Sequence, residues 1–351
     1  MTSPQNARTL PGGIRVYSWP GENGAEPVDV LSVTTIRRLC GVTMPLVNWQ
    51  IANVVNLATG SRRMTFVGPR GGVREKYVAD GEWPGEFARR LADTNGDPEK
   101  IAELRRWLRD AADEPRDVAA TRGSVVHKMI ELNARLDQLT PEYITAKFEE
   151  QWASDKRKTA LVVTEDDQNF VVNCMRQFWD MRAHVPFMIL SAEPQVWSLT
   201  HGYAGSFDVL MWFLPDGVSK DDVPRQPTAD DIRRIGGEVV LGDWKTSKDT
   251  YPEHAVQVTA YLAAEFVGSD GVKDERLTAI LHATMRGALV HIRPDEWSVE
   301  YIDFREDVLR AFLGSCAFAR FLAMNPTLDN IVTEKIAGKA SGTDASAEEA
   351  A

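Results

Sequence analysis

The chain has 351 residues, a hydrophobic fraction of 43% and a formal net charge of −11 at pH 7. That length allows one large domain or two small ones, and the composition suits a globular core rather than a disordered chain. The negative balance argues against tight non-specific binding of nucleic acid by the chain as a whole, although a local basic surface is still allowed.

Cysteine usage and hydropathy narrow the cellular context. Cys40, Cys174 and Cys316 lie far apart and form no CxxC pair, which predicts neither a disulfide framework nor a zinc site. The N-terminus lacks a basic segment followed by an apolar run, and no stretch approaches the roughly 18 uninterrupted apolar residues of a membrane span. We therefore expect no signal peptide, no membrane partner and a cytoplasmic location.

Residues 1–117 are expected to form a mainly helical N-terminal region. Residues 1–30 contain Pro, Gly and Glu with little periodicity, which predicts a loose lead-in. Ser32 or Thr34 can cap a short helix, and Pro45 can open a second one.

A basic, Gly-rich stretch follows within this region. Residues 61–76 hold five basic side chains and one acidic side chain, a local balance of +4. This stretch could follow a phosphate backbone or form a solvated loop, and the sequence leaves both interpretations open. Residues 98–113 then show apolar positions at helical spacing and predict an amphipathic helix.

A second region spans residues 118–325. It begins with a helix expected from Gly123 to Leu136, on which His127 and Glu131 are four residues apart and so share a face. Residues 141–190 contain two further helical patterns. We expect them to form a helical insertion that covers a sheet or narrows access to a site.

Three apolar strand segments come next, each with an acidic residue within it or at its end. They read FMILSAEPQVWSL with Glu193, GYAGSFDVLMWFL with Asp208, and GEVVLGDWKTS with Asp243. Because side chains alternate along a strand, Asp243 and Lys245 fall on the same face. A carboxylate and an ammonium at the end of an apolar strand are costly to bury without a purpose. Their convergence predicts a divalent-metal site with the ammonium directed into it.

The rest of the chain is expected to complete this fold. Gln257 and Tyr261 lie four residues apart in HAVQVTAYLAAEF and share a helix face. LTAILHATM and GALVHIRP predict two more strands, and from about Glu300 the chain is expected to be helical until Pro326. Residues 326–351 are acidic and of low complexity, which predicts a flexible tail.

Four of these elements together resemble the PD-(D/E)XK nuclease superfamily, in particular its RecB-like exonuclease branch. The matching elements are GSFD with Asp208, Asp243-Trp244-Lys245 as D-x-K, Gln257 to Tyr261 as QxxxY, and RGSVVH with His127 as the histidine motif. A lone D-x-K arises by chance, whereas four elements in family order, each in its expected strand or helix, are specific. SVTT followed by PLVNW is also similar to the N-terminal region of phage-encoded members. The resemblance covers about residues 118–300.

The resemblance implies a three-layer, restriction-endonuclease-like α/β core with a mixed central sheet flanked by helices. It also implies a set of site residues. The catalytic residues would be Asp208, Asp243, Lys245, Gln257 and Tyr261. Mg²⁺ or Mn²⁺ would be held by His127, Asp208, Asp243 and the backbone carbonyl of Trp244. Substrate would be bound by Arg122, Gln257 and Tyr261, with supporting roles for Glu131 and Glu193. Some members hold an iron–sulfur cluster with four cysteines, which this chain of three cysteines cannot supply.

The activity implied by the resemblance is that of a metal-dependent DNA exonuclease, a phosphodiester hydrolase acting in recombination or DNA end processing. Two alternatives stay open: a catalytically silent or partner-dependent DNA-binding assembly subunit with the nuclease fold, and a structure-specific endonuclease. The partners implied are DNA and a helicase or recombination (annealing) protein, and homo-oligomerisation stays open. A phage-encoded member would act in the host cytoplasm.

Overall fold

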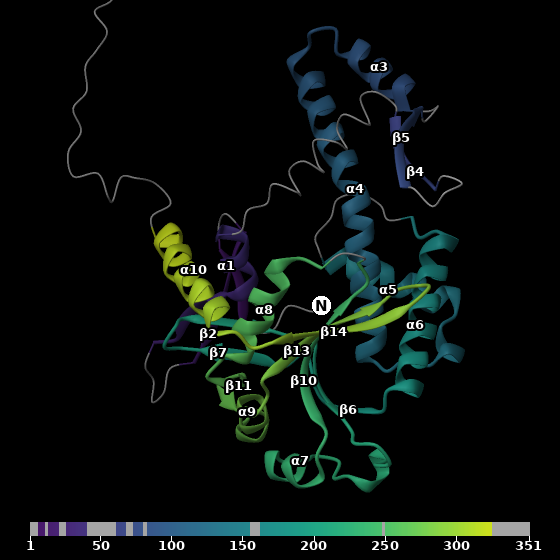
Figure 1. The fold of residues 1–351 in the computed structure, drawn as a ribbon. Coiled ribbons are helices and arrows are strands. Elements are labelled where there is room, and N and C mark those ends of the chain that lie inside the picture. The colour runs from purple at the N-terminus through teal and green to yellow at the C-terminus, as the bar shows by residue number, and fades with distance from the viewer. Residues whose placement is uncertain are drawn as a thin grey trace, which may run out of the picture.

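The computed structural model describes residues 6–10, 13–20, 26–40, 61–67, 73–79, 83–154, 162–247 and 250–324. Within them the chain is mixed α/β, with two mixed sheets, a separate two-stranded hairpin and helices packed around them (Figure 1). None of the helices in this part of the chain combines the length and the apolar character that a membrane crossing demands.

A five-stranded sheet holds the strand with the D-x-K residues, in the order β14-β13-β10-β9-β6. Its strands are β6 (Phe187–Ala192), β9 (Val209–Phe213), β10 (Glu238–Lys245), β13 (Arg286–Ile292) and β14 (Trp297–Asp303). β10 runs parallel to β13, and every other neighbouring pair is antiparallel. β10 is apolar because both of its faces are buried: Val240 and Trp244 join one core cluster, and Leu241 joins another.

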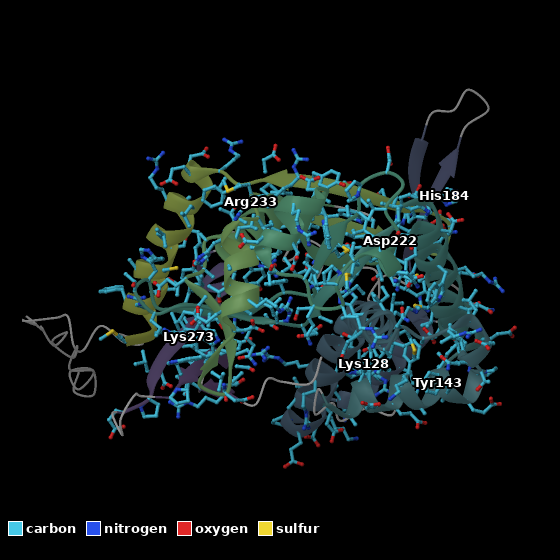
Figure 2. The ribbon with its side chains drawn as sticks, turned by 90° about the horizontal axis from the view of Figure 1, so that it is seen from below. Lys128, Tyr143, His184, Asp222, Arg233 and Lys273 are labelled. Atoms are coloured by element: carbon cyan, nitrogen blue, oxygen red, sulfur yellow. The ribbon has the colours of Figure 1, made fainter. Side chains whose placement is uncertain are left out.

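Helices cover both faces of this sheet and give three layers. The helices on one face are α4 (Pro98–Glu131), α5 (Pro141–Ser154) and α6 (Glu165–His184). The helices on the other face are α1 (Val33–Cys40), α8 (Pro252–Leu262), α9 (Glu275–His282) and α10 (Glu306–Met324). Seen from below, Lys128 of α4 and Tyr143 of α5 lie together in one part of the molecule, well apart from Lys273 (Figure 2). The two helices predicted within residues 141–190 are therefore confirmed, although they end at His184, before β6 begins.

A seven-stranded sheet contains the N-terminal strands, in the order β1-β2-β3-β8-β7-β11-β12. Its strands are β1 (Ala7–Leu10), β2 (Ile14–Trp19), β3 (Val28–Ser32), β7 (Gln195–Ser198), β8 (Tyr203–Ser206), β11 (Phe266–Ser269) and β12 (Val272–Lys273). The prediction of a loose lead-in over residues 1–30 is therefore wrong. The cause is long-range burial: the Trp19 ring packs edge-on against Trp197 and Phe266, with ring centroids 4.9 Å apart in both pairs.

The two sheets meet where the chain passes from one to the other. β6 continues into β7 through Glu193 and Pro194, and β8 continues into β9 through Phe207 and Asp208. These two connections lie side by side, because the Glu193 N–H donates to the Asp208 carbonyl at 2.9 Å. Glu193 has a φ of 52°, a left-handed conformation that is uncommon for a non-glycine residue. The bend therefore places two acidic residues together at the corner between the sheets.

The N-terminal region departs from the mainly helical prediction in a second way. The described positions of residues 61–76 lie on two antiparallel strands, β4 (Ser61–Val67) and β5 (Val73–Ala79), and the Gly-rich residues 68–72 lie outside the described residues. α3 (Trp83–Thr94) packs against α4, away from the two sheets (Figure 1).

α4 joins this outlying part to the sheets as one continuous helix of 34 residues, about 50 Å long. It starts at the Asp97 cap, whose side chain accepts from the Glu99 N–H at 2.8 Å. The helices predicted over residues 98–113 and 123–136 are thus a single element, and the predicted boundary at residues 117–118 falls inside it.

Two further predictions of secondary structure are wrong. LTAILHATM is mostly α9, because the Asp274 side chain accepts from the Leu277 N–H and caps a helix. The helix predicted from about Glu300 begins only at Glu306, because residues 300–303 belong to β14. A short helix, α7 (Ala229–Ile235), lies in the connection between β9 and β10. The helix predicted from Pro45 and the tail at residues 326–351 lie outside the described residues. The short helix capped by Ser32 is confirmed: its hydroxyl accepts from the Thr35 N–H at 3.0 Å.

We expect Gly287→Ala to destabilise the fold, because α8 lies directly on β13 at this glycine. A Cβ at Gly287 would clash with Val258 Cγ1 and lie 3.2 Å from the Leu241 carbonyl oxygen. Such overpacking typically costs about 1–3 kcal/mol of unfolding free energy, which urea denaturation would measure. The control is Gly314→Ala within α10, where nothing lies within 4 Å of the added Cβ. That variant should gain about 0.5–1 kcal/mol, and equal losses in both variants would contradict the packing argument.

Candidate functional site

Asp208 and Asp243 face each other at the corner between the sheets. β9 and β10 pair as far as Val209 opposite Gly242, and continuing this antiparallel register sets Asp208 opposite Asp243. Both aspartates are 6% exposed. Asp208 Oδ2 accepts a hydrogen bond from the Trp244 N–H at 2.7 Å. Two buried carboxylates predicted from the sequence are thus brought together.

Negative charge accumulates at this corner. Burial, followed by the charges of Asp243 and Glu193, raises the pKa of Asp208 well above its ordinary value, and Lys245 opposes this only in part. The pKa of Glu193 is also raised, first by burial and then by the charge of Glu131. Because each negative charge disfavours ionisation of its neighbour, a cation bound between these carboxylates would stabilise their ionised forms.

Lys245 completes the face of β10 that carries Asp243. Its Nζ lies 2.5 Å from Asp243 Oδ2, and its side chain is 20% exposed. Asp243 Oδ2 nevertheless makes no geometrically acceptable hydrogen bond. The ammonium neutralises the carboxylate without satisfying it, so this oxygen keeps an acceptor position that another partner could fill.

His127 reaches the same corner from α4, in the helical layer that α4 forms with α5 and α6. Its Nδ1 lies 3.6 Å from Asp208 Oδ2 and is buried without a hydrogen-bond partner. Burial lowers the pKa of His127 to about 4, with Asp243 raising it and Lys245 lowering it. The imidazole is therefore neutral at pH 7, the form that binds a metal. Gly123 lets α4 approach, because a Cβ there would lie 3.0 Å from Thr246 Oγ1.

The backbone of Trp244 presents one more oxygen. In an antiparallel arrangement the N–H and C=O of a residue point to the same side of the strand. Because the Trp244 N–H points to Asp208, its carbonyl also points toward the corner. The Trp244 backbone also acts on the His127 pKa as a hydrogen-bonding group, which is consistent with this orientation.

These donors fit a hard divalent cation. The set offers two carboxylates, a backbone carbonyl and a neutral imidazole, and two of its buried atoms, Asp243 Oδ2 and His127 Nδ1, lack hydrogen-bond partners. As the side chains stand, no three His, Cys, Asp or Glu residues within the described ranges are gathered closely enough to coordinate a metal. Asp208 is engaged by the Trp244 N–H and Asp243 by Lys245, so coordination would exchange these partners for the cation.

α8 carries Gln257 and Tyr261, and the Asp243 charge reaches Tyr261. Gln257 Nε2 donates to Tyr261 Oη at 3.2 Å. Burial and the charge of Asp243 raise the pKa of Tyr261, so the phenol keeps its proton. Gly205 makes room for the ring, because a Cβ there would lie 2.5 Å from Tyr261 Cε1.

Two residues near this group were not predicted. His254 is buried, and its pKa is lowered by burial and then by the charge of Lys245. Its position three residues before Gln257 and seven before Tyr261 is a helical-face spacing that could have indicated it. Arg37 of α1 donates from Nη1 to Gln257 Oε1 at 2.9 Å, a pairing across the whole sequence that no local pattern reveals.

Arg122, predicted to bind substrate, makes an ion pair with a carboxylate of α6. Its Nε lies 2.5 Å from Asp167 Oδ1, and its guanidinium lies over the Phe170 ring. Burial raises the pKa of Asp167, but hydrogen bonds from Thr164 and the pairing with Arg122 outweigh it, so the net shift is downward. Arg122 is thus held by a buried carboxylate of α6, a partner that the sequence does not predict.

Glu193 and Glu131 were expected to have supporting roles. Glu193 adjoins Asp208 at the sheet corner. Glu131 pairs with Lys128 at 2.9 Å, and its charge acts on Glu193. The structure thus places Glu193 beside Asp208, and Glu131 within charge range of Glu193.

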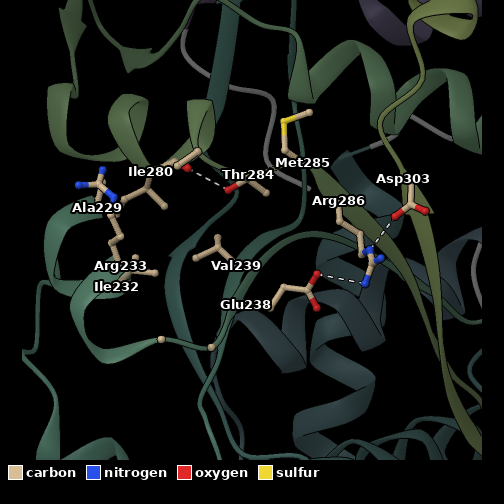
Figure 3. A pocket seen from close by; sticks show the side chains of 13 residues that line it. Ala229, Ile232, Arg233, Glu238, Val239, Ile280, Thr284, Met285, Arg286 and Asp303 are labelled. Carbon is tan, nitrogen blue, oxygen red and sulfur yellow. Dashed lines mark hydrogen bonds and ion pairs between the residues drawn. The ribbon is translucent and has the colours of Figure 1, made fainter.

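A cavity of about 470 Å³ lies elsewhere, between α7, α9 and the start of β10. In it Arg286 lies between two carboxylates, 3.1 Å from Glu238 Oε1 and 2.7 Å from Asp303 Oδ1 (Figure 3). Glu238 begins β10, whereas Asp243 and Lys245 lie toward its other end. This cavity is therefore separate from the carboxylate site.

A scan of the chain against protein-family models gives no match, and a search of curated proteins also gives none.

Proposed function

We propose that this chain is a metal-dependent deoxyribonuclease of the PD-(D/E)XK superfamily, acting as an exonuclease of the RecB-like type. The observation that carries the proposal is the convergence of Asp208, Asp243 and Lys245 with His127 at one buried corner. These residues come from α4, the β8–β9 connection and β10. Motif residues this far apart in the sequence would not be expected to meet if the motif match were accidental.

The fold supports the same proposal. A mixed five-stranded sheet between two helical layers is the arrangement that a restriction-endonuclease-like core requires. In such a core the D-x-K strand would be central, and β10 has β9 on one side and β13 on the other.

The metal in this proposal is Mg²⁺ or Mn²⁺, held by Asp208, Asp243, His127 and the Trp244 carbonyl. When bound, such an ion lowers the pKa of a coordinated water and polarises the scissile phosphate. Asp208 and Asp243 supply the negative charge that attracts the ion. The neutral His127 adds a donor without adding charge.

Lys245 and the α8 residues would act on the substrate. The Lys245 ammonium can hold the attacking water or stabilise the charge that develops on the phosphoryl oxygens. Gln257 and the protonated Tyr261 offer hydrogen-bond donors to phosphate or sugar oxygens. The Gln257–Tyr261 hydrogen bond holds these two groups in fixed relation before substrate arrives.

One observation favours a second candidate, a DNA-binding subunit that keeps the nuclease fold without cutting. Both aspartates already have partners within the chain: Asp208 accepts from the Trp244 N–H, and Asp243 forms an ion pair with Lys245. If these pairings persist at millimolar Mn²⁺, the chain would bind DNA without hydrolysing it or would need a partner protein to open the site.

We expect the purified chain to degrade linear DNA in Mg²⁺ or Mn²⁺ and to be silent in EDTA. End-labelled linear duplex, linear single strand and closed circular DNA would be incubated side by side. Loss of linear DNA alone supports an exonuclease, and the label gives its polarity, whereas cutting of the circle identifies an endonuclease. Calorimetric Mn²⁺ binding without digestion of any substrate would favour the silent or partner-dependent subunit. Digestion that continues in EDTA would overturn the metal-dependent proposal.

A further inference from the structure

Arg37 approaches the carboxylate site from the N-terminal segment, outside the four nuclease elements that contain His127, Asp208, Asp243 and Gln257. β3 pairs in parallel with β8, with Ser32 opposite Ala204. α1 follows β3 directly, and β8 leads directly to Asp208. The same strand pair therefore fixes Arg37 and the carboxylate corner relative to each other, and α1 also packs against α8.

The hydrogen bond from Arg37 determines how the Gln257 amide is oriented. A guanidinium can only donate, so the Gln257 oxygen must face Arg37 and its nitrogen must face Tyr261. Because the Tyr261 oxygen accepts from Gln257, the phenolic proton is left for another acceptor. The charges of Asp243 and, more weakly, Asp208 act on Tyr261, together with the neighbouring Tyr17. Arg37 thus orders a chain of donors that runs through Gln257 to Tyr261, whose phenol lies within reach of the Asp243 charge.

Arg37 also brings a positive charge that no carboxylate neutralises within the described ranges. Its one side-chain hydrogen bond there is to the neutral Gln257 amide. Arg122, by comparison, is paired with Asp167, and Arg286 with two carboxylates. The Arg37 charge also contributes to lowering the His254 pKa, which shows that it acts in the same region as Lys245. A partly buried guanidinium with unused donors matches the paired oxygens of a phosphate.

We propose that Arg37 binds a backbone phosphate of the nucleic-acid strand beside the carboxylate site and, through the same guanidinium, orients Gln257. This inference rests on the proposed nuclease function. It assigns the N-terminal β1–β3 and α1 segment a direct part in holding the substrate.

The test compares Arg37→Gln and Arg37→Lys with Arg38→Gln as the matched control. Arg38 is the neighbouring arginine, is exposed, and donates to the Gly13 carbonyl. Binding of a short labelled single strand and a duplex would be followed by fluorescence anisotropy in EDTA over a series of salt concentrations. We expect Arg37→Gln to bind about tenfold more weakly and to lower the salt slope by about one. Arg37→Lys should keep the salt slope and lose part of the affinity, because lysine keeps the positive charge but cannot donate the two parallel hydrogen bonds of a guanidinium.

Digestion kinetics separate this inference from the function on which it rests. With Mg²⁺, Arg37→Gln should raise KM and, by releasing Gln257, also lower kcat, while Arg38→Gln should match the wild type. A wild type that digests DNA, with Arg37→Gln and Arg38→Gln identical in KM and salt slope, overturns the Arg37 role and leaves the nuclease intact. A change in melting temperature with an unchanged salt slope would assign Arg37 a structural role only. A wild type that binds no DNA at any salt concentration overturns both proposals.

Discussion

Asp208→Asn should abolish metal-dependent DNA digestion and at the same time make the metal-free protein more stable. Activity should fall by at least about 10²-fold, since losing a direct ligand should cost no less than the 10–100-fold seen for outer-shell partners. The Asn oxygen can still accept the Trp244 N–H that Asp208 Oδ2 accepts at 2.7 Å. The substitution therefore removes one of two facing carboxylates while retaining the hydrogen bond.

The sign of the stability change follows from the Asp208 pKa. Burial and the charges of Asp243 and Glu193 raise this pKa in the folded protein, so the folded state binds the proton more tightly than the unfolded chain does. Asp208 therefore lowers the stability of the metal-free wild type as pH rises above its unfolded value of about 4. Asp208→Asn lacks this penalty and should gain about 1 kcal/mol at neutral pH, the size common when a functional site is relieved.

Asp167→Asn is the matched control, because the Asp167 side chain is also 6% exposed but its pKa is lowered. The ionised Asp167 side chain stabilises the folded protein above the unfolded pKa, and this stabilisation is lost as pH falls. Asp167→Asn should therefore be less stable than the wild type at pH 7 and approach the stability of the wild type in acid. Urea denaturation in EDTA from pH 4 to pH 8, repeated with Mn²⁺, measures both. An Asp208→Asn protein that is less stable than wild type at pH 8 would contradict the crowded-carboxylate argument.

The sequence was sufficient to predict those parts of the site that depend on local periodicity. Alternation along β10 placed Asp243 and Lys245 on one face, and helical spacing placed Gln257 beside Tyr261; the structure has both arrangements. The burial of β10 could likewise be inferred from its own run of apolar residues. These features need only the geometry of one element.

Features that depend on distant packing were not predictable in this way. Arg122 lies in a motif, but its pairing with Asp167 of α6 joins positions 45 apart. Arg37 meets Gln257 across 220 positions. β2 is a strand because Trp19 packs against Trp197, and residues 1–30 alone contain no sign of that partner. The β-branched residues of LTAILHATM suggested a strand, whereas the Asp274 cap determines a helix.

Lys245→Met should produce a different pattern from Asp208→Asn: turnover lost, metal binding kept. Lys245 Nζ lies 2.5 Å from Asp243 Oδ2, where it balances the carboxylate and competes with a cation for the same oxygen. Removing the ammonium should leave Mn²⁺ affinity equal or tighter. It should lower kcat by about 10²–10³-fold, the loss typical of one preorganised charge-stabilising donor.

Lys147→Met is the control, because it also removes a lysine that forms an ion pair. Lys147 is 22% exposed and lies 2.6 Å from Glu150 on α5, so it matches the 20% exposure and pairing distance of Lys245 but lies outside the carboxylate site. Isothermal titration with Mn²⁺ and steady-state digestion would be run on both variants. If Lys245→Met keeps its turnover, the lysine serves only to balance Asp243, and charge stabilisation must come from another group. If it loses Mn²⁺ binding together with turnover, the ammonium orders the ligands instead of acting on the phosphate. Only a loss of turnover with metal binding retained separates the chemistry at phosphorus from the assembly of the site.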